Sequence, residues 1–136
     1  MSSRLRINFL EPFYGGSHKA FADTLMASID ADWKLLSLPD RNWKWHMEGA
    51  PSYWAQEHRD ILTRGTDLMV ASSYVDLARL RGLVPSLCDV PTLLYFHENQ
   101  FAYPRRKSRP KQGAEDLKYG YTQLLSAACA DRVVFN

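Results

Sequence analysis

The chain has 136 residues, of which 46% are hydrophobic and 24% are charged, and its formal net charge is +2. A chain of this size and composition can bury the core of one domain, which excludes a disordered or fibrous protein. The net charge is too small to require a nucleic acid or a membrane as partner. Evidence for an RNA partner must therefore come from local clusters of charge.

Neither a membrane span nor a secretion signal is visible. No apolar run approaches the ~20 residues that cross a bilayer, and residues 1–6 lead directly into a strand without the apolar core of a signal peptide. The cysteines, Cys88 and Cys129, have no CxxC or metal-binding spacing and are predicted to be reduced, buried thiols. We expect a cytoplasmic protein.

The first third of the chain shows a strand, a glycine turn, a helix and a second strand. The apolar run at 4–10 predicts a strand that ends before Pro12. Apolar residues at helical spacing predict a helix over 18–29 with Ser17 as its N-cap, and residues 33–38 predict the second strand.

The middle of the chain contains two strongly apolar runs. Residues 42–47 are rich in aromatic side chains and are predicted to form a short strand or a loop, whereas Pro51 predicts the first turn of a helix. The runs at 67–71 and 91–96 are typical of buried parallel strands, and a short helix is expected over 75–81.

The last third predicts a loop over 103–113, a helix over 114–129 and a final strand over 131–136. Strands that alternate with helices indicate an α/β fold with a doubly wound, mostly parallel, Rossmann-like sheet. Because the chain stops at the end of a strand, we expect it to be the first half of a larger protein.

A glycine pair, Gly15-Gly16, lies between the first strand and the first helix. Glycines there let the backbone approach a ligand, and the amides of a helix N-terminus favour an anion. The segment is neither GxGxxG nor a Walker loop. A phosphate or sugar contact and a purely structural turn are both open, and Lys19 in the first helical turn slightly favours an anion.

Four polar residues, His97-Glu98-Asn99-Gln100, follow the strand at 91–96. Buried polar groups need partners, so a cluster at a strand end indicates function, although His97 and Asn99 could instead cap loops. A zinc-protease HExxH motif is excluded because Phe101 occupies the position of its second histidine.

Other residues at strand ends and in loops give weaker signals. Ser72 and Ser73 follow a strand and either bind a ligand or cap a helix, but they lack the glycines of a nucleophile elbow. The run of basic residues after the His97 segment is either a solvated loop or a contact for RNA phosphates. Its members are Arg105, Arg106, Lys107, Arg109 and Lys111. Four aromatic residues could stack on bases, although packing is their commoner role: Trp43, Trp45, Tyr53 and Trp54.

Four segments together resemble the N-terminal domain of the tRNA-queuosine α-mannosyltransferase family: residues 11–18, 95–104, 119–121 and 130–136. The resemblance implies a retaining, GT4-like GT-B glycosyltransferase, with two Rossmann-like domains that face a cleft. It implies GDP-mannose as donor substrate, queuosine in tRNA as acceptor, and neither a cofactor nor a metal ion. Residues 1–136 would form the acceptor-side domain, and the donor-binding C-terminal domain would be missing from this chain.

The resemblance also implies roles for single residues. His97 would sit at the reacting centre, position the sugar and stabilise charge, with Glu98 as a second catalytic contributor. Gly15 and Gly16 would approach the donor diphosphate or the transferred sugar. Further candidates for donor or substrate binding are Ser17, Lys19, Asn99 and Ser72, and candidates for RNA binding are Arg105, Arg106, Lys107 and Arg109.

Two alternatives to this function are open at this point. One is another GT4-like transferase with a lipid or small-molecule acceptor. The other is a non-catalytic module that binds RNA or a nucleotide, because most of the nucleotide-sugar site of such enzymes lies in the missing domain.

Overall fold

The computed structural model describes residues 3–98 and 114–136, so the predicted loop over 103–113 lies outside the described residues. The elements in chain order are β1 (Arg6–Tyr14), α1 (Gly16–Ser28), β2 (Asp32–Pro39), α2 (Trp43–Glu57), α3 (Arg59–Thr63), β3 (Leu68–Ser72), α4 (Leu77–Leu83), the 3₁₀ helix η1 (Pro85–Asp89), β4 (Thr92–Phe96), α5 (Ala114–Cys129) and β5 (Arg132–Phe135).

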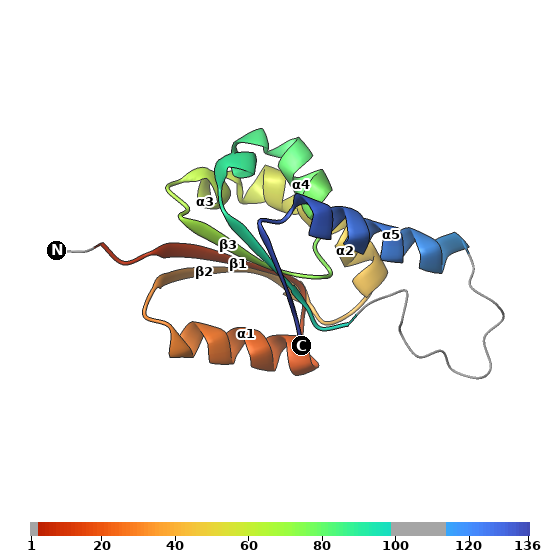
Figure 1. Ribbon diagram of the computed structural model, residues 1–136, viewed down its shortest axis with the longest axis horizontal. Coiled ribbons are helices and arrows are strands. Elements are labelled where there is room, and N and C mark those ends of the chain that lie inside the picture. The colour runs from red at the N-terminus through yellow and green to blue at the C-terminus, as the bar shows by residue number, and fades with distance from the viewer. Residues whose placement is uncertain (1–2, 99–113) are drawn as a thin grey trace.

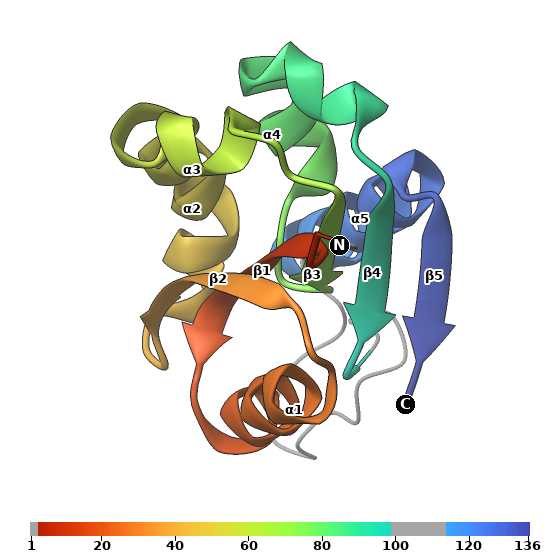
Figure 2. The same cartoon turned by 90° about the vertical axis from the view of Figure 1, so that its left-hand side faces the viewer.

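The strands form one sheet in the order β2-β1-β3-β4-β5, and every described neighbouring pair is parallel. Helix α1 lies on one face of this sheet, and α2, α3, α4 and α5 lie on the other (Figure 1). Figure 2 shows the strands side by side with their arrowheads at one edge. The predicted doubly wound α/β fold is confirmed, and its described part is wholly parallel.

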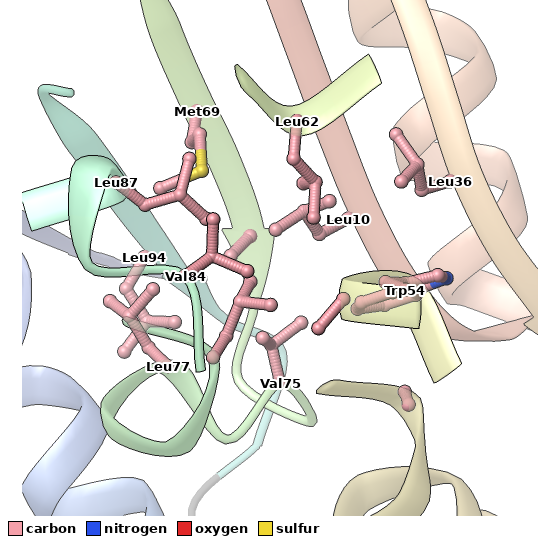
Figure 3. Close-up of a cluster of buried hydrophobic side chains, with 14 of the residues drawn as sticks. Leu10, Leu36, Trp54, Leu62, Met69, Val75, Leu77, Val84, Leu87 and Leu94 are labelled. Atoms are coloured by element: carbon pink, nitrogen blue, oxygen red, sulfur yellow. The ribbon is translucent and has the colours of Figure 1, made fainter. Parts of the chain in front are cut away.

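Two apolar cores flank the sheet because successive side chains of β1 point to opposite faces. Ile7 and Phe9 pack with Ala22 of α1 in the smaller core. Leu10 faces the other way, into the larger core under α2, α3 and α4, where Trp54 and other side chains point toward one another (Figure 3). Because the side chains of β1 alternate between the two faces of the sheet, this one strand packs against helices on both faces.

The aromatic segment at 42–47 is helical, so the prediction of a strand or loop was wrong. Trp43 begins α2, and the buried residues Met47, Ala50 and Trp54 continue at helical spacing. Pro51 lies inside this helix rather than in its first turn. A proline there removes a backbone hydrogen bond and costs roughly 3 kcal/mol, which burial of this face of α2 offsets.

The start of α1 also differs from the prediction. Strand β1 continues through Pro12 to Tyr14, with an irregular register between Glu11 and Tyr14. The N-cap position is Gly15, and no side chain caps the helix, so Ser17 lies inside α1 and is not its cap. Because no side chain caps α1, the first backbone amides of this helix are exposed at the carboxyl edge of the sheet.

Helix α5 turns polar side chains inward. Ser126 accepts a hydrogen bond from the Leu77 amide over 3.0 Å and donates one to the Val75 carbonyl over 3.1 Å. The apolar residues that mark this helix in the sequence lie mostly on its outer face, where Leu117 and Tyr121 are 47% and 58% exposed. The need to satisfy buried backbone groups beside α4 decides the orientation of the helix.

Two smaller observations complete the fold. Both cysteines are free, but Cys88 is exposed and Cys129 is half-buried, so the prediction of buried thiols was wrong for Cys88. Among residues 3–98 and 114–136, every helix is too short or too polar to cross a membrane.

The larger core predicts the effect of shortening a side chain of β1. Leu10 is fully buried, whereas Leu5 is 56% exposed. We expect Leu10→Ala to lower the free energy of unfolding by about 2–5 kcal/mol, because the substitution leaves a cavity, and Leu5→Ala to change it by less than about 0.5 kcal/mol. Urea unfolding followed by circular dichroism measures both, and equal effects would contradict this description of the core.

Candidate functional site

The candidate site lies where the strand order changes direction. From β1 the chain passes to β2 on one side of the sheet and later to β3 on the other side. In open parallel sheets, ligands bind beyond the carboxyl ends of the strands at such a switch point. Both of the motifs predicted to carry function lie at this edge: residues 11–18 form the end of β1 and the start of α1, and the His97 segment follows β4.

Glu11 connects three segments at the switch point. Its side chain is fully buried. Its Oε1 accepts hydrogen bonds from the Phe13 amide and the Ser72 hydroxyl, each over 3.0 Å, and its Oε2 lies 3.1 Å from Nδ1 of His18. A buried carboxyl group without partners would be strongly destabilising, so these contacts hold β1, β3 and α1 in one arrangement.

His18 lies in the first turn of α1 and is 5% exposed. Its ring stacks between Tyr74 and His97, with ring centroids 4.8 Å and 4.0 Å away. A carboxylate oxygen accepts hydrogen bonds, so Nδ1 of His18 is the donor in its contact with Glu11.

His97 follows β4 and completes the stack. Phe21 and Tyr95 contact its ring edge to face, with centroids 5.2 Å and 4.7 Å away. Burial, and then the charge of His18, lower the pKa of His97 to about 4, so the ring is neutral at neutral pH. Its Nε2 is buried and has no hydrogen-bond partner among the described residues. Such a nitrogen can form a hydrogen bond with a ligand, as acceptor or donor according to which ring nitrogen carries the proton.

Glu98 stands beside this stack. It accepts a hydrogen bond from the Tyr74 hydroxyl, and Nε2 of Gln123 donates to its backbone carbonyl over 3.5 Å. Burial raises the pKa of the Glu98 carboxyl group, and His18 opposes this effect. The Glu98 side chain is therefore placed where it can form a hydrogen bond with a ligand.

The two positions of the glycine pair require glycine for different physical reasons. Gly16 adopts a φ of +51°, which favours glycine. At Gly15 the backbone is extended, but an added Cβ would lie 2.2 Å from the Cβ of Asp40. The pair therefore allows the chain to turn tightly into α1 beside the turn after β2.

Comparison with known proteins identifies the family. Residues 6–136 match the family described as tRNA-queuosine alpha-mannosyltransferase N-terminal. A Drosophila melanogaster protein named tRNA-queuosine alpha-mannosyltransferase is 39% identical over 132 residues, which cover 96% of this chain and 33% of that protein. The chain belongs to the tRNA-queuosine α-mannosyltransferase family. It spans about a third of that relative's length, and no solved structure matches it.

The structure brings together only some of the candidate residues that the sequence analysis singled out. His97, Glu98 and Ser72 lie in the cluster around Glu11 and His18. Lys19 instead pairs with Asp23 on the exposed side of α1, and this hydrogen bond raises its pKa. Ser17 is exposed. The remaining candidates lie outside the described residues: Asn99, Arg105, Arg106, Lys107 and Arg109.

Sequence reasoning missed three members of the site: Glu11, His18 and Tyr74. Glu11 did carry a signal, because it is a charged residue directly after the apolar run of a predicted strand. His18 is polar in the buried face of a helix, which also requires a partner. Nothing in the sequence marks Tyr74, whose role depends on β3 and β4 being neighbours.

Glu11, His18 and His97 also offer one metal-ligand atom each, and these atoms lie within 4.8 Å of one another. Carboxylate oxygen and imidazole nitrogen suit zinc and other transition metals. In the structure, however, Glu11 uses both its oxygens for hydrogen bonds. The cluster is therefore arranged either as a hydrogen-bonded site or, after a small rearrangement, as a metal site.

The lowered pKa of His97 predicts a pH dependence of stability. Below about pH 6.5 the unfolded chain takes up a proton on this residue, whereas the folded chain does so only near pH 4. Stability therefore falls as the pH is lowered through this range, by less than about 1.4 kcal/mol per pH unit because solvent screens the half-buried ring. The variant His97→Gln should lack this contribution, so its stability relative to the wild type should improve from pH 7 to pH 4.

Urea unfolding at several pH values tests this expectation. His58→Gln is a matched control, because His58 lies at the end of α2, outside the stack. A constant difference between His97→Gln and the wild type at all pH values would show that the His97 ring titrates normally in the folded protein.

Proposed function

We propose that this chain is the acceptor-side domain of a retaining GT-B glycosyltransferase, which transfers mannose from GDP-mannose to queuosine in tRNA. The observation that carries the proposal is the match of nearly the whole chain to a relative named tRNA-queuosine alpha-mannosyltransferase. A cytoplasmic location follows from a tRNA acceptor. The site supports the proposal because its polar groups gather at the edge of the sheet where ligands bind.

The chemistry of the cluster suits a sugar. A neutral His97 with an unpartnered Nε2 can accept a hydrogen bond from a sugar hydroxyl. The rings of Phe21 and Tyr95 beside it offer apolar surface to the sugar carbons. Glu11 and His18 hold His97 in position through the stacked rings. In this role they do not react themselves.

In the proposed reaction, the bond between the anomeric carbon of mannose and the β-phosphate oxygen breaks. The acceptor hydroxyl oxygen forms its bond to the same face of that carbon, and the leaving diphosphate takes the acceptor proton. The exposed amides at the start of α1, next to Gly15 and Gly16, favour negative charge and support a role near the diphosphate.

A transfer assay tests the proposed function. The full-length enzyme is incubated with GDP-mannose and either queuosine-containing or queuosine-free tRNA, and mass spectrometry detects the addition of a hexose. We expect the addition only on queuosine-containing tRNA. Equal labelling of both tRNAs would refute the acceptor. Labelling of neither tRNA, with transfer to a lipid or a small molecule, would show a different transferase.

Substitution of His97 tests the site in the same assay. We expect His97→Ala to lower kcat/KM by roughly a hundredfold or more, because the side chain contacts the sugar and the other groups of the site remain. The matched control is His58→Ala, which should retain activity. Full activity of His97→Ala would remove His97 from the reacting centre.

We further propose that transfer requires no metal ion. The only Asp-x-Asp spacing in the sequence, Asp30-Ala31-Asp32, runs into the first residue of β2, at the opposite edge of the sheet from the site. There Asp30 pairs with Arg4 and Asp32 with Lys34. Dialysis against EDTA should leave the rate unchanged. A loss of activity that zinc or manganese restores would instead assign Glu11, His18 and His97 as metal ligands.

A further inference from the structure

Tyr74 contacts both the ring of His18 and the carboxyl group of Glu98. It lies two residues after β3 and is 6% exposed. Its ring stacks on His18 and Trp43, with centroids 4.8 Å and 5.3 Å away, and Phe13 contacts it edge to face at 5.9 Å. Its hydroxyl donates a hydrogen bond to Oε1 of Glu98. The ring and the hydroxyl therefore contact different groups, and a substitution can separate their effects.

Hydrogen bonds fix the backbone on both sides of Tyr74. The Ser73 amide donates to the Tyr95 carbonyl of the neighbouring strand over 2.8 Å. The Val75 amide donates to the Ser72 carbonyl over 3.0 Å. A buried ring on such a backbone has few alternative orientations, so its hydroxyl has a defined position. Tyr74 therefore meets the requirements of a residue that positions a neighbour.

The carboxyl group of Glu98 needs such a neighbour. A glutamate side chain has several rotatable bonds, so its orientation is lost unless a partner holds it. Within the described part of the chain, the Tyr74 hydroxyl is the donor to Oε1, and Oε2 of Glu98 has no hydrogen bond. An ionised carboxyl group can only accept. Oε2 is therefore suited to a ligand that donates a hydrogen bond.

We propose that Tyr74 is a positioning residue, whose hydroxyl holds Glu98 so that Oε2 accepts a hydrogen bond from a hydroxyl group of the ligand. The inference rests on the proposed function, which supplies two sources of such a group: the mannose of the donor and the sugar-like ring of queuosine. The chemistry is the same in both, a neutral alcohol that donates a hydrogen bond. A carboxylate would repel a phosphate group instead.

Two affinity ratios of the full-length enzyme test the inference, and neither requires transfer. The Kd of GDP divided by that of GDP-mannose measures the contribution of mannose. The Kd of queuosine-free tRNA divided by that of queuosine-containing tRNA measures the contribution of queuosine. Calorimetry gives the first ratio and filter binding the second.

We expect Tyr74→Phe to lower one of these ratios about three- to tenfold, which corresponds to one hydrogen bond. The Kd values of GDP and queuosine-free tRNA should not change, because these reference ligands lack the hydroxyl groups in question. The ratio that falls shows whether Glu98 contacts the sugar or the acceptor. If neither ratio falls, the inference is wrong.

A double-variant cycle with Glu98→Ala shows whether Tyr74 acts through Glu98. Glu98→Ala alone should lower the same ratio at least as much as Tyr74→Phe does. In the Glu98→Ala background, Tyr74→Phe should have no further effect, because the group that it positions is gone. Equal fold-changes of Tyr74→Phe with and without the Glu98 carboxyl group would overturn the inference.

Tyr74→Phe keeps the ring and its stacking, so the variant should fold. Tyr121→Phe is the matched control, because it removes the hydroxyl of a tyrosine that is 58% exposed on α5. This control should bind all of the ligands like the wild type. A merely structural role of the Tyr74 hydroxyl would weaken the binding of GDP and GDP-mannose by the same factor, and this result would contradict a positioning role.

Failure of the proposed function gives a different result from failure of the inference. A wild-type enzyme that binds both tRNAs equally would refute queuosine as the acceptor, and the mannose ratio would still test Tyr74. Wild-type ratios of one for both pairs of ligands would refute the proposed function and the inference together. Normal transfer to queuosine-containing tRNA, with both ratios unchanged in Tyr74→Phe, would refute the inference alone.

Discussion

The buried carboxyl group of Glu11 is the constraint on which the arrangement of the site depends. A fully buried charge must have partners, and the three contacts of Glu11 come from β1, β3 and α1. These contacts link the first turn of α1 to the neighbouring strand β3. They also hold Nδ1 of His18 against the carboxyl group. A site with this geometry requires all three elements to be in place.

The side chains that Glu11 holds in place continue into a row of stacked rings: His97, His18, Tyr74 and Trp43. Planar stacking restricts each ring by its neighbours, so the row can hold its shape before a ligand binds. Its two ends differ in chemistry. The His97 end has a buried ring nitrogen without a partner among the described residues, whereas the Trp43 end opens into a hollow of about 370 Å³ that Trp45 and Tyr119 also line.

Several elements show why prediction from sequence succeeded for the fold and only in part for the site. The strands and α1 followed from local periodicity and from glycine and proline positions. The first two turns of helix α2 were missed because Pro51 suggested a helix start, although the burial of Met47 and Trp54 outweighs the cost of a proline inside the helix. Helix α5 was placed correctly, but its inward face depends on buried backbone groups near α4, which no local pattern reveals.

The sequence by itself determined the order of strands and helices, the family, and two of the segments that form the site, because these depend on residues close together in the chain. Only the tertiary structure decided which side chains meet. Glu11 and Ser72 are 61 positions apart and touch because β1 and β3 are neighbours at the switch point. Trp43 and Tyr119 form one hollow because α2 and α5 cover the same face of the sheet. Long-range contacts of this kind depend on strand order and helix packing, which local sequence patterns do not specify.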